Sequence, residues 1–336
     1  MIAAAEGVFG WLDSARRGRL SASSAAMGPL CFLHVPKCGG QSVERALEAA
    51  LPDGAVAPRG ADLGGSRIVS DLDSFDDADE WVRALIAITD EDVESLRTHR
   101  VVAGHYMLAT FLRISRPARI ATVLREPRAR LLSLYLFFRT PQMREVWADY
   151  CGTMLAGASR ALEQFLHDPR LARATDNQVC RMVLDGDRRV PDDGFIAEHD
   201  AERIAASALE QLDRLGFVGI LESGDALWRD LSDMFGVPLV PRRVNESSTP
   251  VASVGAAPIP PYDSAAVFDG LERRTAADRI VYETLVARTC GGLDEARRRA
   301  DTALAKQLDR FHQVGARSTA GPPRAPLATA YRKEGR

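Results

Sequence analysis

The stretch LCFLHVPKCGGQSVERALEAAL, residues 30–51, joins a strand pattern to a helix pattern through two glycines. Residues 30–35 form an apolar run of strand length, which is typical of a strand covered on both faces. From Gln41 onward, apolar residues recur at i, i+3, i+4 and i+7, which predicts an amphipathic helix with Glu44 on its polar face. A strand that leads through glycines directly into a helix is the layout of a phosphate-binding loop.

The loop between the strand and the helix, PKCGGQS, has the composition of an anion site. Gly39 and Gly40 let the backbone bend tightly and approach an anion closely. The free N–H groups at the helix start point at that anion, and the helix dipole favours it. Lys37 adds a mobile charge and Ser42 a hydroxyl group. The chain has only three lysines against forty arginines, so a lysine here indicates a need for a compact ammonium.

The order of residues differs from that of a Walker A loop, GxxxxGK[ST], in which the lysine follows the glycines. Here Lys37 precedes them and the loop is shorter, which favours a nucleotide-like ligand over ATP hydrolysis. On this stretch alone, the alternative is a plain strand-to-helix turn that carries a surface lysine.

A second stretch, TVLREPRARLLSLYLFFR (122–139), repeats this layout. Arg125 stands where a strand pattern stops, and Pro127 suits the first turn of a helix. Ser133 follows Pro127 by six residues, about 9 Å along the axis. Arg125 and Ser133 could therefore hold one phosphate between them, because arginine suits bidentate phosphate contacts. The alternative is that Arg125 pairs with Glu126 or a neighbouring acid and that Ser133 is a small residue on a packed helix face.

Further strand and helix patterns alternate along the chain. Strands are predicted at 100–104, 118–125 and 215–221, and helices at 127–139, 158–167, 176–184, 225–235, 270–289 and 293–312. This alternation predicts an α/β fold, a parallel sheet flanked by helices on both faces. Ligands of such folds bind at the carboxyl ends of the strands, where both motifs lie.

The composition bounds the class of protein. We expect an N-terminal arm (1–28), a single domain (29–315) and a disordered tail (316–336). The net charge of −3 lacks the basic bias of a nucleic-acid-binding protein, and no apolar run reaches the roughly 18 residues of a membrane span. Five widely spaced cysteines without a CxxC pair indicate neither a disulfide framework nor a structural metal. No secretory signal pattern is present, so a cytoplasmic location is expected.

Taken together, the two motifs resemble those of sulfotransferases that use 3′-phosphoadenosine 5′-phosphosulfate (PAPS). HVPKCGGQS is similar to their 5′-phosphosulfate-binding loop, usually PKTGGTS, and LREPRARLLSLY is similar to their 3′-phosphate-binding segment, typically REPxxRxxSxY. The sequences of both motifs are most similar to the carbohydrate-type branch, which includes heparan sulfate 2-O-sulfotransferases and many bacterial proteins. DNQVCRMV (176–183) and FVGILES (217–223) also resemble segments of that branch. The likeness spans about residues 30–250 and becomes weak after RRVNES (242–247).

The resemblance implies a P-loop-NTPase-like fold and in-line transfer of a sulfuryl group from PAPS, as co-substrate, to an acceptor hydroxyl or amine, which releases 3′,5′-ADP. It implies no metal. The implied donor-binding residues are Pro36, Lys37, Cys38, Gly39, Gly40, Gln41 and Ser42 for the phosphosulfate, with Arg125 and Ser133 for the 3′-phosphate. Lys37 would lie on the oxygen that bridges sulfur and phosphorus, with Ser42 or Ser133 as its partner while no acceptor is bound.

Two residues of the loop depart from the family pattern. Cys38 and Gln41 stand where the family usually has threonine. The change at Cys38 removes one hydroxyl donor but need not abolish contacts made by backbone N–H groups. Cys38 as a nucleophile is disfavoured, because no base is supplied beside it.

His105 is the candidate base. It stands just past the predicted strand at 100–104 and resembles the histidine of a Gly-His pair that acts as general base in the uronyl 2-O branch. The alternative is a core or capping histidine. His34, inside the predicted strand before the loop, is expected to be structural.

Two other functions are open. A P-loop-like nucleotide kinase would need a Mg²⁺-binding carboxylate at a strand end, and none of the four predicted strands ends in Asp. A non-catalytic nucleotide-binding protein on the same fold would need no base. Residues 52–98 and 139–175 are expected to shape the acceptor pocket, for a carbohydrate or a small molecule. The acidic stretch 61–95 favours a small or neutral acceptor over a polyanionic glycan.

Overall fold

The fold is built on one sheet of four parallel strands. The computed structural model describes residues 28–57, 88–140, 152–241 and 264–319. The strands are β1 (Leu30–Leu33), β2 (Val101–Gly104), β3 (Ile120–Leu124) and β4 (Phe217–Ile220), in the order β2-β1-β3-β4. In the register, Leu33 of β1 faces Gly104 on one side and Thr122 on the other, so the carboxyl ends lie side by side. The predicted α/β fold with a parallel sheet is confirmed.

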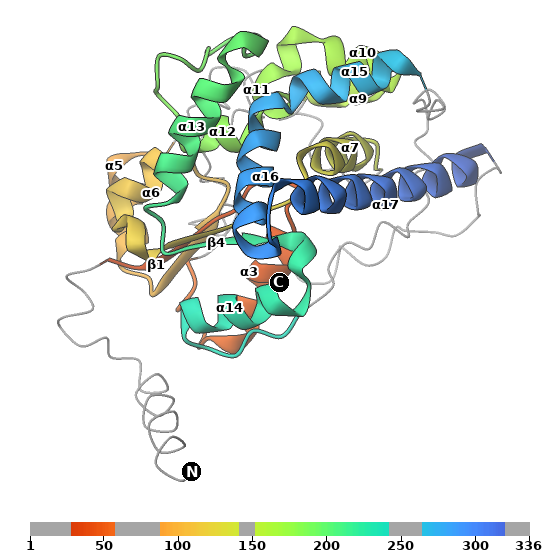
Figure 1. The fold of residues 1–336 in the computed structure, drawn as a ribbon. Coiled ribbons are helices and arrows are strands. Elements are labelled where there is room, and N and C mark those ends of the chain that lie inside the picture. The colour runs from red at the N-terminus through yellow and green to blue at the C-terminus, as the bar shows by residue number, and fades with distance from the viewer. Residues whose placement is uncertain (1–27, 58–87, 141–151, 242–263, 320–336) are drawn as a thin grey trace, which may run out of the picture.

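Helices cover both faces of this sheet and extend beyond one end (Figure 1). They are α3 (Gly40–Ala50), α5 (Asp90–Arg97), α6 (Leu108–Ile114), α7 (Pro127–Phe138), α9 (Gly152–Ala158), α10 (Leu162–His167), α11 (Ala172–Thr175), α12 (Gln178–Val183), α13 (Ala201–Leu212), α14 (Asp225–Phe235), α15 (Ala265–Arg274), α16 (Ala276–Cys290) and α17 (Leu293–Thr319). None of these described helices combines the length and the apolar character that a membrane crossing requires.

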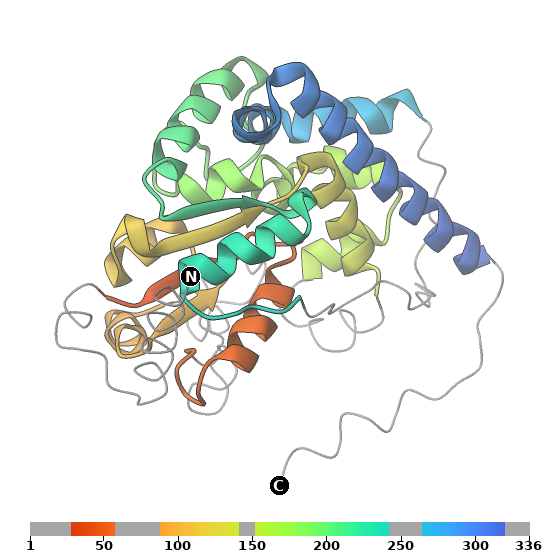
Figure 2. The ribbon, with the colours of Figure 1, turned by 60° about the horizontal axis from the view of Figure 1, so that its bottom comes forward.

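Alternate residues of the strands feed two separate cores. Phe32 packs in a cluster with residues of α3 and α14, whereas its neighbours Cys31 and Leu33 pack in a cluster with residues of α6, α12, α13 and α16. The period of two follows from the pleat of a strand. Figure 2 shows α3 and α14 on one side of the sheet and α13 on the other. The two helix layers cover the faces of the sheet, and both motifs lie at the edge formed by the carboxyl ends of the strands.

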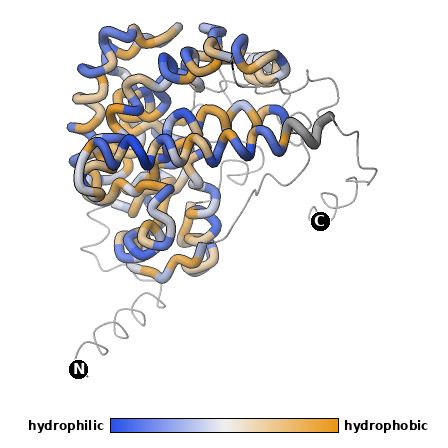
Figure 3. The backbone as a smooth tube through the Cα atoms, turned by 45° about the vertical axis from the view of Figure 1, so that its right-hand side comes forward, coloured by the Kyte–Doolittle hydropathy of each residue, from blue (hydrophilic) through white to orange (hydrophobic). Residues whose placement is uncertain are grey.

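A third core lies beyond the sheet and joins α7, α9, α10, α15 and α17. Tyr135 of α7 and Phe311 of α17 stack with ring centroids 5.9 Å apart. Along α17, apolar and charged residues alternate as on a helix with one buried side (Figure 3). This third core fixes α17 against the helix that carries the second motif.

Three helix predictions are corrected by the structure. The helix predicted at 270–289 is two helices, α15 and α16, which meet at Thr275. The helix predicted at 158–167 is interrupted, because the carbonyls of Ala158 and Arg160 accept hydrogen bonds from Arg139 and Tyr135 instead of continuing a helix. The last helix continues to Thr319, beyond the predicted start of the tail. Helices α5, α6 and α13 were not predicted.

Several expectations concern residues outside the described parts. These are most of the N-terminal arm (1–27), residues 58–87 and 141–151 of the predicted acceptor segments, the RRVNES stretch and residues 320–336.

Candidate anion-binding site at the carboxyl ends of the strands

The loop after β1 requires glycine at two positions for two different reasons. Gly39 has a left-handed φ of 81°, and a Cβ there would lie 2.8 Å from Leu221 Cδ1. At Gly40, a Cβ would lie 2.0 Å from His34 Cδ2, so the ring of His34 fills the space of a side chain. The loop backbone is therefore pressed against two neighbouring side chains.

Part of the predicted backbone cradle is used by the loop itself. The N–H of Cys38 donates to the carbonyl of Val35 at 3.2 Å, and the N–H of Ser42 donates to that of Gly39 at 3.0 Å. In the described part of the chain, no acceptor takes the N–H of Gly39 or Gly40. These two groups, at the start of α3, are the ones available to an anion.

Lys37 adopts a conformation that non-glycine residues rarely take. Its φ is 67°, in the left-handed region. Its ammonium lies 3.7 Å from the centroid of the Phe137 ring, a cation–π distance. Burial, and then the nearby charges of Arg125 and Arg310, lower the pKa of Lys37 to about 7. An approaching anion would raise that pKa, so Lys37 is a cation that responds to a ligand.

Arg125 crosses from the second motif to the first. Its Nη1 donates to the carbonyl of Lys37 at 3.2 Å, and its Nη2 donates to Gln307 Oε1 at 2.7 Å. The alternative pairing of Arg125 with Glu126 is wrong, because the buried carboxylate of Glu126 accepts from Arg128 Nε at 2.7 Å and from the N–H of Ala129. Glu126 therefore caps α7, and the structure joins the two motifs through Arg125.

One side of α7 faces the loop. Arg130, Ser133 and Phe137 follow at i, i+3 and i+7, which places them on one side of the helix. Phe137 lies under the Lys37 ammonium. The charge of Arg130 acts on the buried thiol of Cys38, whose pKa burial nonetheless raises to about 12. Ser133 thus lies on the predicted side of α7, and Cys38 stays protonated, which argues against a nucleophilic role.

Arg130 was not predicted as a site residue, yet it is the most unusual group of this region. It is 1% exposed, and none of its three guanidinium nitrogens has a hydrogen-bond partner in the described residues. A buried guanidinium without a partner is costly. Lys37 and Arg125 likewise lack a carboxylate partner in the part of the chain that the structure describes. Arg128, by contrast, pairs with three carboxylates. The three cations around the loop thus leave a positive charge that an anion could neutralise.

His105 reaches the same edge from β2. Its Nδ1 lies 2.7 Å from the carbonyl oxygen of His34, which can only accept, so Nδ1 carries the hydrogen and Nε2 holds the lone pair. Burial, and then His34, lower the pKa of His105 to about 3. His105 is therefore neutral near pH 7, with a nitrogen that can accept a proton.

His34 and Glu44 form a buried pair behind the loop. His34 Nδ1 lies 2.7 Å from Glu44 Oε1, and the rings of His34 and His105 lie 4.0 Å apart. The expectation that Glu44 lies on the polar face of its helix is wrong, because Glu44 is buried against His34. His34 thus supports the loop at Gly40 through its ring and the candidate base through its carbonyl.

Glu222 holds the start of α7 from the far side. The N–H of Glu126 donates to Glu222 Oε1 and the Tyr282 hydroxyl donates to Oε2, both at 3.1 Å. Glu222 belongs to the segment FVGILES, so this part of the predicted pattern positions Arg125 through its neighbour.

The segment 176–183 has a structural role. Asn177 Oδ1 accepts from the N–H groups of Ala277 and Asp278, at 2.8 and 3.1 Å. The Asp278 carboxylate accepts in return from the N–H groups of Val179 and Cys180, at 3.0 and 2.9 Å. Each helix start is thus capped by a residue at the start of the other, and Asn177 causes the break between α15 and α16.

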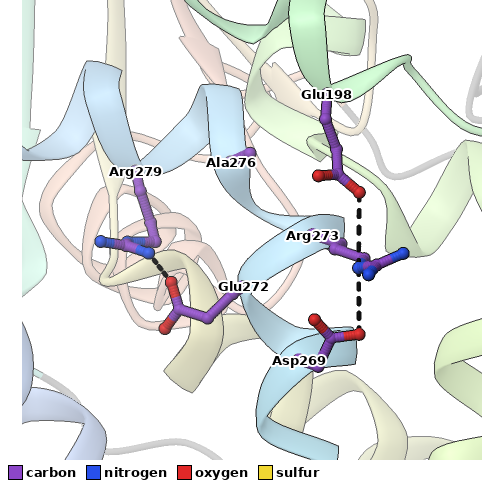
Figure 4. Close-up of a pocket in the computed structure, with 6 residues that line it drawn as sticks. All are labelled: Glu198, Asp269, Glu272, Arg273, Ala276 and Arg279. Carbon is purple, nitrogen blue, oxygen red and sulfur yellow. Dashed lines mark ion pairs between the residues drawn. The ribbon is translucent and has the colours of Figure 1, made fainter. Parts of the chain in front are cut away.

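A charged depression lies elsewhere on the surface (Figure 4). It is lined by Glu198, Asp269, Glu272, Arg273, Ala276 and Arg279. Arg273 pairs with Asp269 at 3.0 Å and with Glu198 at 3.4 Å, and Arg279 pairs with Glu272. Its carboxylates outnumber its guanidinium groups, so it lacks the excess positive charge of the loop region. None of the predicted site residues lines it.

Neither a protein-family model nor a curated protein matches the chain. Among the described residues, no group of three or more His, Cys, Asp or Glu side chains could hold a metal ion. The functional argument therefore rests on the geometry of the two motifs.

Proposed function

We propose that this protein is a PAPS-dependent sulfotransferase of the carbohydrate type, with a P-loop-like donor site. It would transfer a sulfuryl group in line to an acceptor hydroxyl of a carbohydrate or small molecule and release 3′,5′-ADP. The observation that supports this most is the group of three cations, Lys37, Arg125 and Arg130, which have no carboxylate partner among the described residues and surround a glycine loop. A ligand with negative charge at both ends fits such a group.

The donor-binding roles follow from the position of each residue. The N–H groups of Gly39 and Gly40, with Lys37, would hold the phosphosulfate at the start of α3. Arg125 and Ser133 would hold the 3′-phosphate, since Arg125 reaches the loop at the carbonyl of Lys37 and Ser133 lies on the side of α7 that faces the loop. When bound, PAPS supplies the activated sulfuryl group.

Lys37 would stabilise the charge that develops during transfer. As the bond between sulfur and the bridging oxygen breaks, negative charge grows on that oxygen. The pKa of about 7 in the ligand-free protein rises when phosphates approach, so Lys37 is protonated in the donor complex. A buried ammonium is most effective there, because no water screens it.

His105 would act as the base. As the acceptor oxygen bonds to sulfur, its proton passes to Nε2 of His105, the nitrogen that carries the lone pair when Nδ1 donates to the His34 carbonyl. The resulting imidazolium is stabilised by the negative charges of the departing phosphate and of Glu44, which raises the pKa of His105.

Ligand-induced thermal stabilisation tests the donor site. We expect 3′,5′-ADP to raise the melting temperature and ATP with Mg²⁺ to have no such effect. Arg125→Ala should weaken binding of 3′,5′-ADP by about 2–4 kcal/mol, the cost of truncating a buried charged contact. Stabilisation by ATP with Mg²⁺ alone would favour the kinase, and donor affinity that is unchanged in Arg125→Ala would refute its role.

Turnover tests the catalytic residues. With labelled PAPS and an acceptor found by screening, Lys37→Ala and His105→Ala should fold but lose activity, about 10²-fold or more for the base. His199→Ala is the matched control, because its side chain is 84% exposed. Transfer at the parent's rate by Lys37→Ala would contradict the proposal, and binding of 3′,5′-ADP without transfer to any acceptor would favour a non-catalytic binder.

A further inference from the structure

The helix α17 lies along the helix that carries the second motif. It packs against both α7 and α16, which lie beside it in Figure 1. Leu304, Phe311 and Val314 are buried in the same core as Leu131 and Tyr135 of α7. The position of α17 beside the donor segment is thus fixed by burial and by the stacking of Phe311 on Tyr135.

The side of α17 that meets the motifs carries two polar residues one turn apart. Gln307 is buried, and its Oε1 accepts from Arg125 Nη2 at 2.7 Å. Arg310 follows at i+3, on the same side of the helix. Its charge is near enough to lower the pKa of Lys37. α17 therefore presents an amide to Arg125 and brings the charge of Arg310 near Lys37.

We infer that α17 is a third donor-binding element, in which Arg310 contacts the 5′-phosphate end of the nucleotide beside Lys37 and Gln307 holds Arg125 in place for the 3′-phosphate. This inference rests on the proposed function. It extends the donor site beyond the loop and α7 to a segment that neither motif includes.

The charges explain why such an arrangement would persist. The charges of Arg125 and Arg310 both act against the ammonium of Lys37 in a partly buried space, where like charges cost more than in water. An anion between Lys37 and Arg310 relieves this repulsion and gains a charge-assisted hydrogen bond. Gln307 suits its position because it orients the Arg125 guanidinium without neutralising it, as a carboxylate would.

Isothermal titration calorimetry with two nucleotides separates the role of Arg310 from that of Gln307. We expect Arg310→Gln to weaken 3′,5′-ADP about tenfold or more, the size of one lost charged hydrogen bond, and to leave adenosine 3′-monophosphate unchanged. Arg298→Gln is the matched control, since Arg298 is 69% exposed on the same helix and pairs with Glu295. It should change neither affinity.

Gln307→Glu tests the second residue. The new carboxylate should pair with Arg125 and weaken both nucleotides, whereas Thr302→Glu, which adds the same charge at an exposed position of α17, should weaken neither. If the parent binds 3′,5′-ADP while Arg310→Gln and Gln307→Glu bind it equally well, the inference about α17 is overturned. If the parent binds neither nucleotide, the proposed function itself fails.

Discussion

At the scale of single residues, Lys37 combines two unfavourable conditions. A left-handed φ is strained for a residue with a side chain, and an ammonium loses hydration over the ring of Phe137. Strain of this kind persists where the surrounding structure enforces it, and it is concentrated at functional sites. Lys37 therefore lowers the stability of the ligand-free protein in exchange for a charge placed at the loop.

The lowered pKa of Lys37 makes the stability of the folded protein depend on pH. The pKa of Lys37 is about 7 in the folded protein against 10.5 for an ordinary lysine, so between these values the unfolded chain binds more protons and the free energy of unfolding rises with pH. Below pH 7 the destabilisation is complete. Lys37→Met has no ammonium to desolvate, so its melting temperature should be higher than that of the parent at pH 6. The difference between the two melting temperatures should become smaller towards pH 10. Calorimetric scans across this range measure it.

Lys306→Met is the control for that series, because Lys306 is exposed on α17. Its melting temperature should follow that of the parent at every pH. Parallel curves for Lys37→Met and the parent would show that the ammonium is not desolvated.

Gly40 offers a steric test. Gly40→Ala would place a Cβ 2.0 Å from His34, and such overpacking costs about 1–3 kcal/mol of unfolding free energy. Gly152→Ala, where no atom lies within 4 Å of the added Cβ, should be nearly neutral. Urea unfolding of Gly40→Ala, His34→Ala and the double variant should give a double-variant loss smaller than the sum of the single losses. Additive losses would contradict the contact.

The residues of the site differ in how far the sequence could predict them. Lys37, Gly39 and Gly40 are local in the chain, so their pattern predicts a loop of this kind and the structure forms one. Glu44 was assigned to the wrong face, because helical periodicity cannot show that a histidine behind the helix needs a partner. Arg130 lies within the quoted motif, but only tertiary packing shows that its guanidinium is buried without a partner.

At the scale of elements, α12 and α16 depend on each other at their first turns. The hydrogen bonds from Ala277 and Asp278 to Asn177, and those from Val179 and Cys180 to Asp278, satisfy donors that would otherwise be buried without an acceptor. Each helix thus supplies the cap that the other lacks, across about a hundred residues of chain.

Two substitutions of Asn177 separate the stability contributed by its cap from that contributed by its left-handed backbone conformation. Its φ is 47°, which glycine adopts freely and alanine does not. Asn177→Gly should lose only the cap, about 1–2 kcal/mol, and Asn177→Ala should lose more. Urea unfolding monitored by circular dichroism measures both. If both variants had the same urea unfolding midpoint as the parent, the reciprocal cap would contribute nothing to stability.

The four strands and the helices α3, α7 and α14 could be predicted because each has a clear apolar pattern and a proline or glycine at a boundary. The remaining elements show why such patterns have limits. The helix α13 buries Ala201, Ile204, Ala205, Ala208 and Leu212, which recur at helical spacing, so the sequence contains a signal for this helix too. The helix α5 has a capping box from Thr89 and Asp92, a signal that the sequence contains and that was not used. The break at Thr275 was not predictable, since Asn177 lies far away in the chain.

At the scale of the whole molecule, the candidate site brings together three parts of the chain. The loop at 35–42 and the start of α7 lie about 85 residues apart, and α17 follows some 170 residues after α7. The first two parts carry recognisable motifs, so the sequence could predict that they meet at the strand ends. The third part carries no motif, and it is brought near by the burial of Leu304, Phe311 and Val314 in the core that includes α7.

The order of these parts has a consequence for synthesis on the ribosome. Of the described elements α17 emerges last, and until it does, the side of α7 on which Phe311 stacks at Tyr135 lacks this part of its cover. A nascent chain halted before residue 293 should expose this side and be held by chaperones that recognise apolar surfaces. The candidate site around Lys37 and Arg125 would then be complete only once α17 has packed on α7, and not with the earlier formation of the sheet.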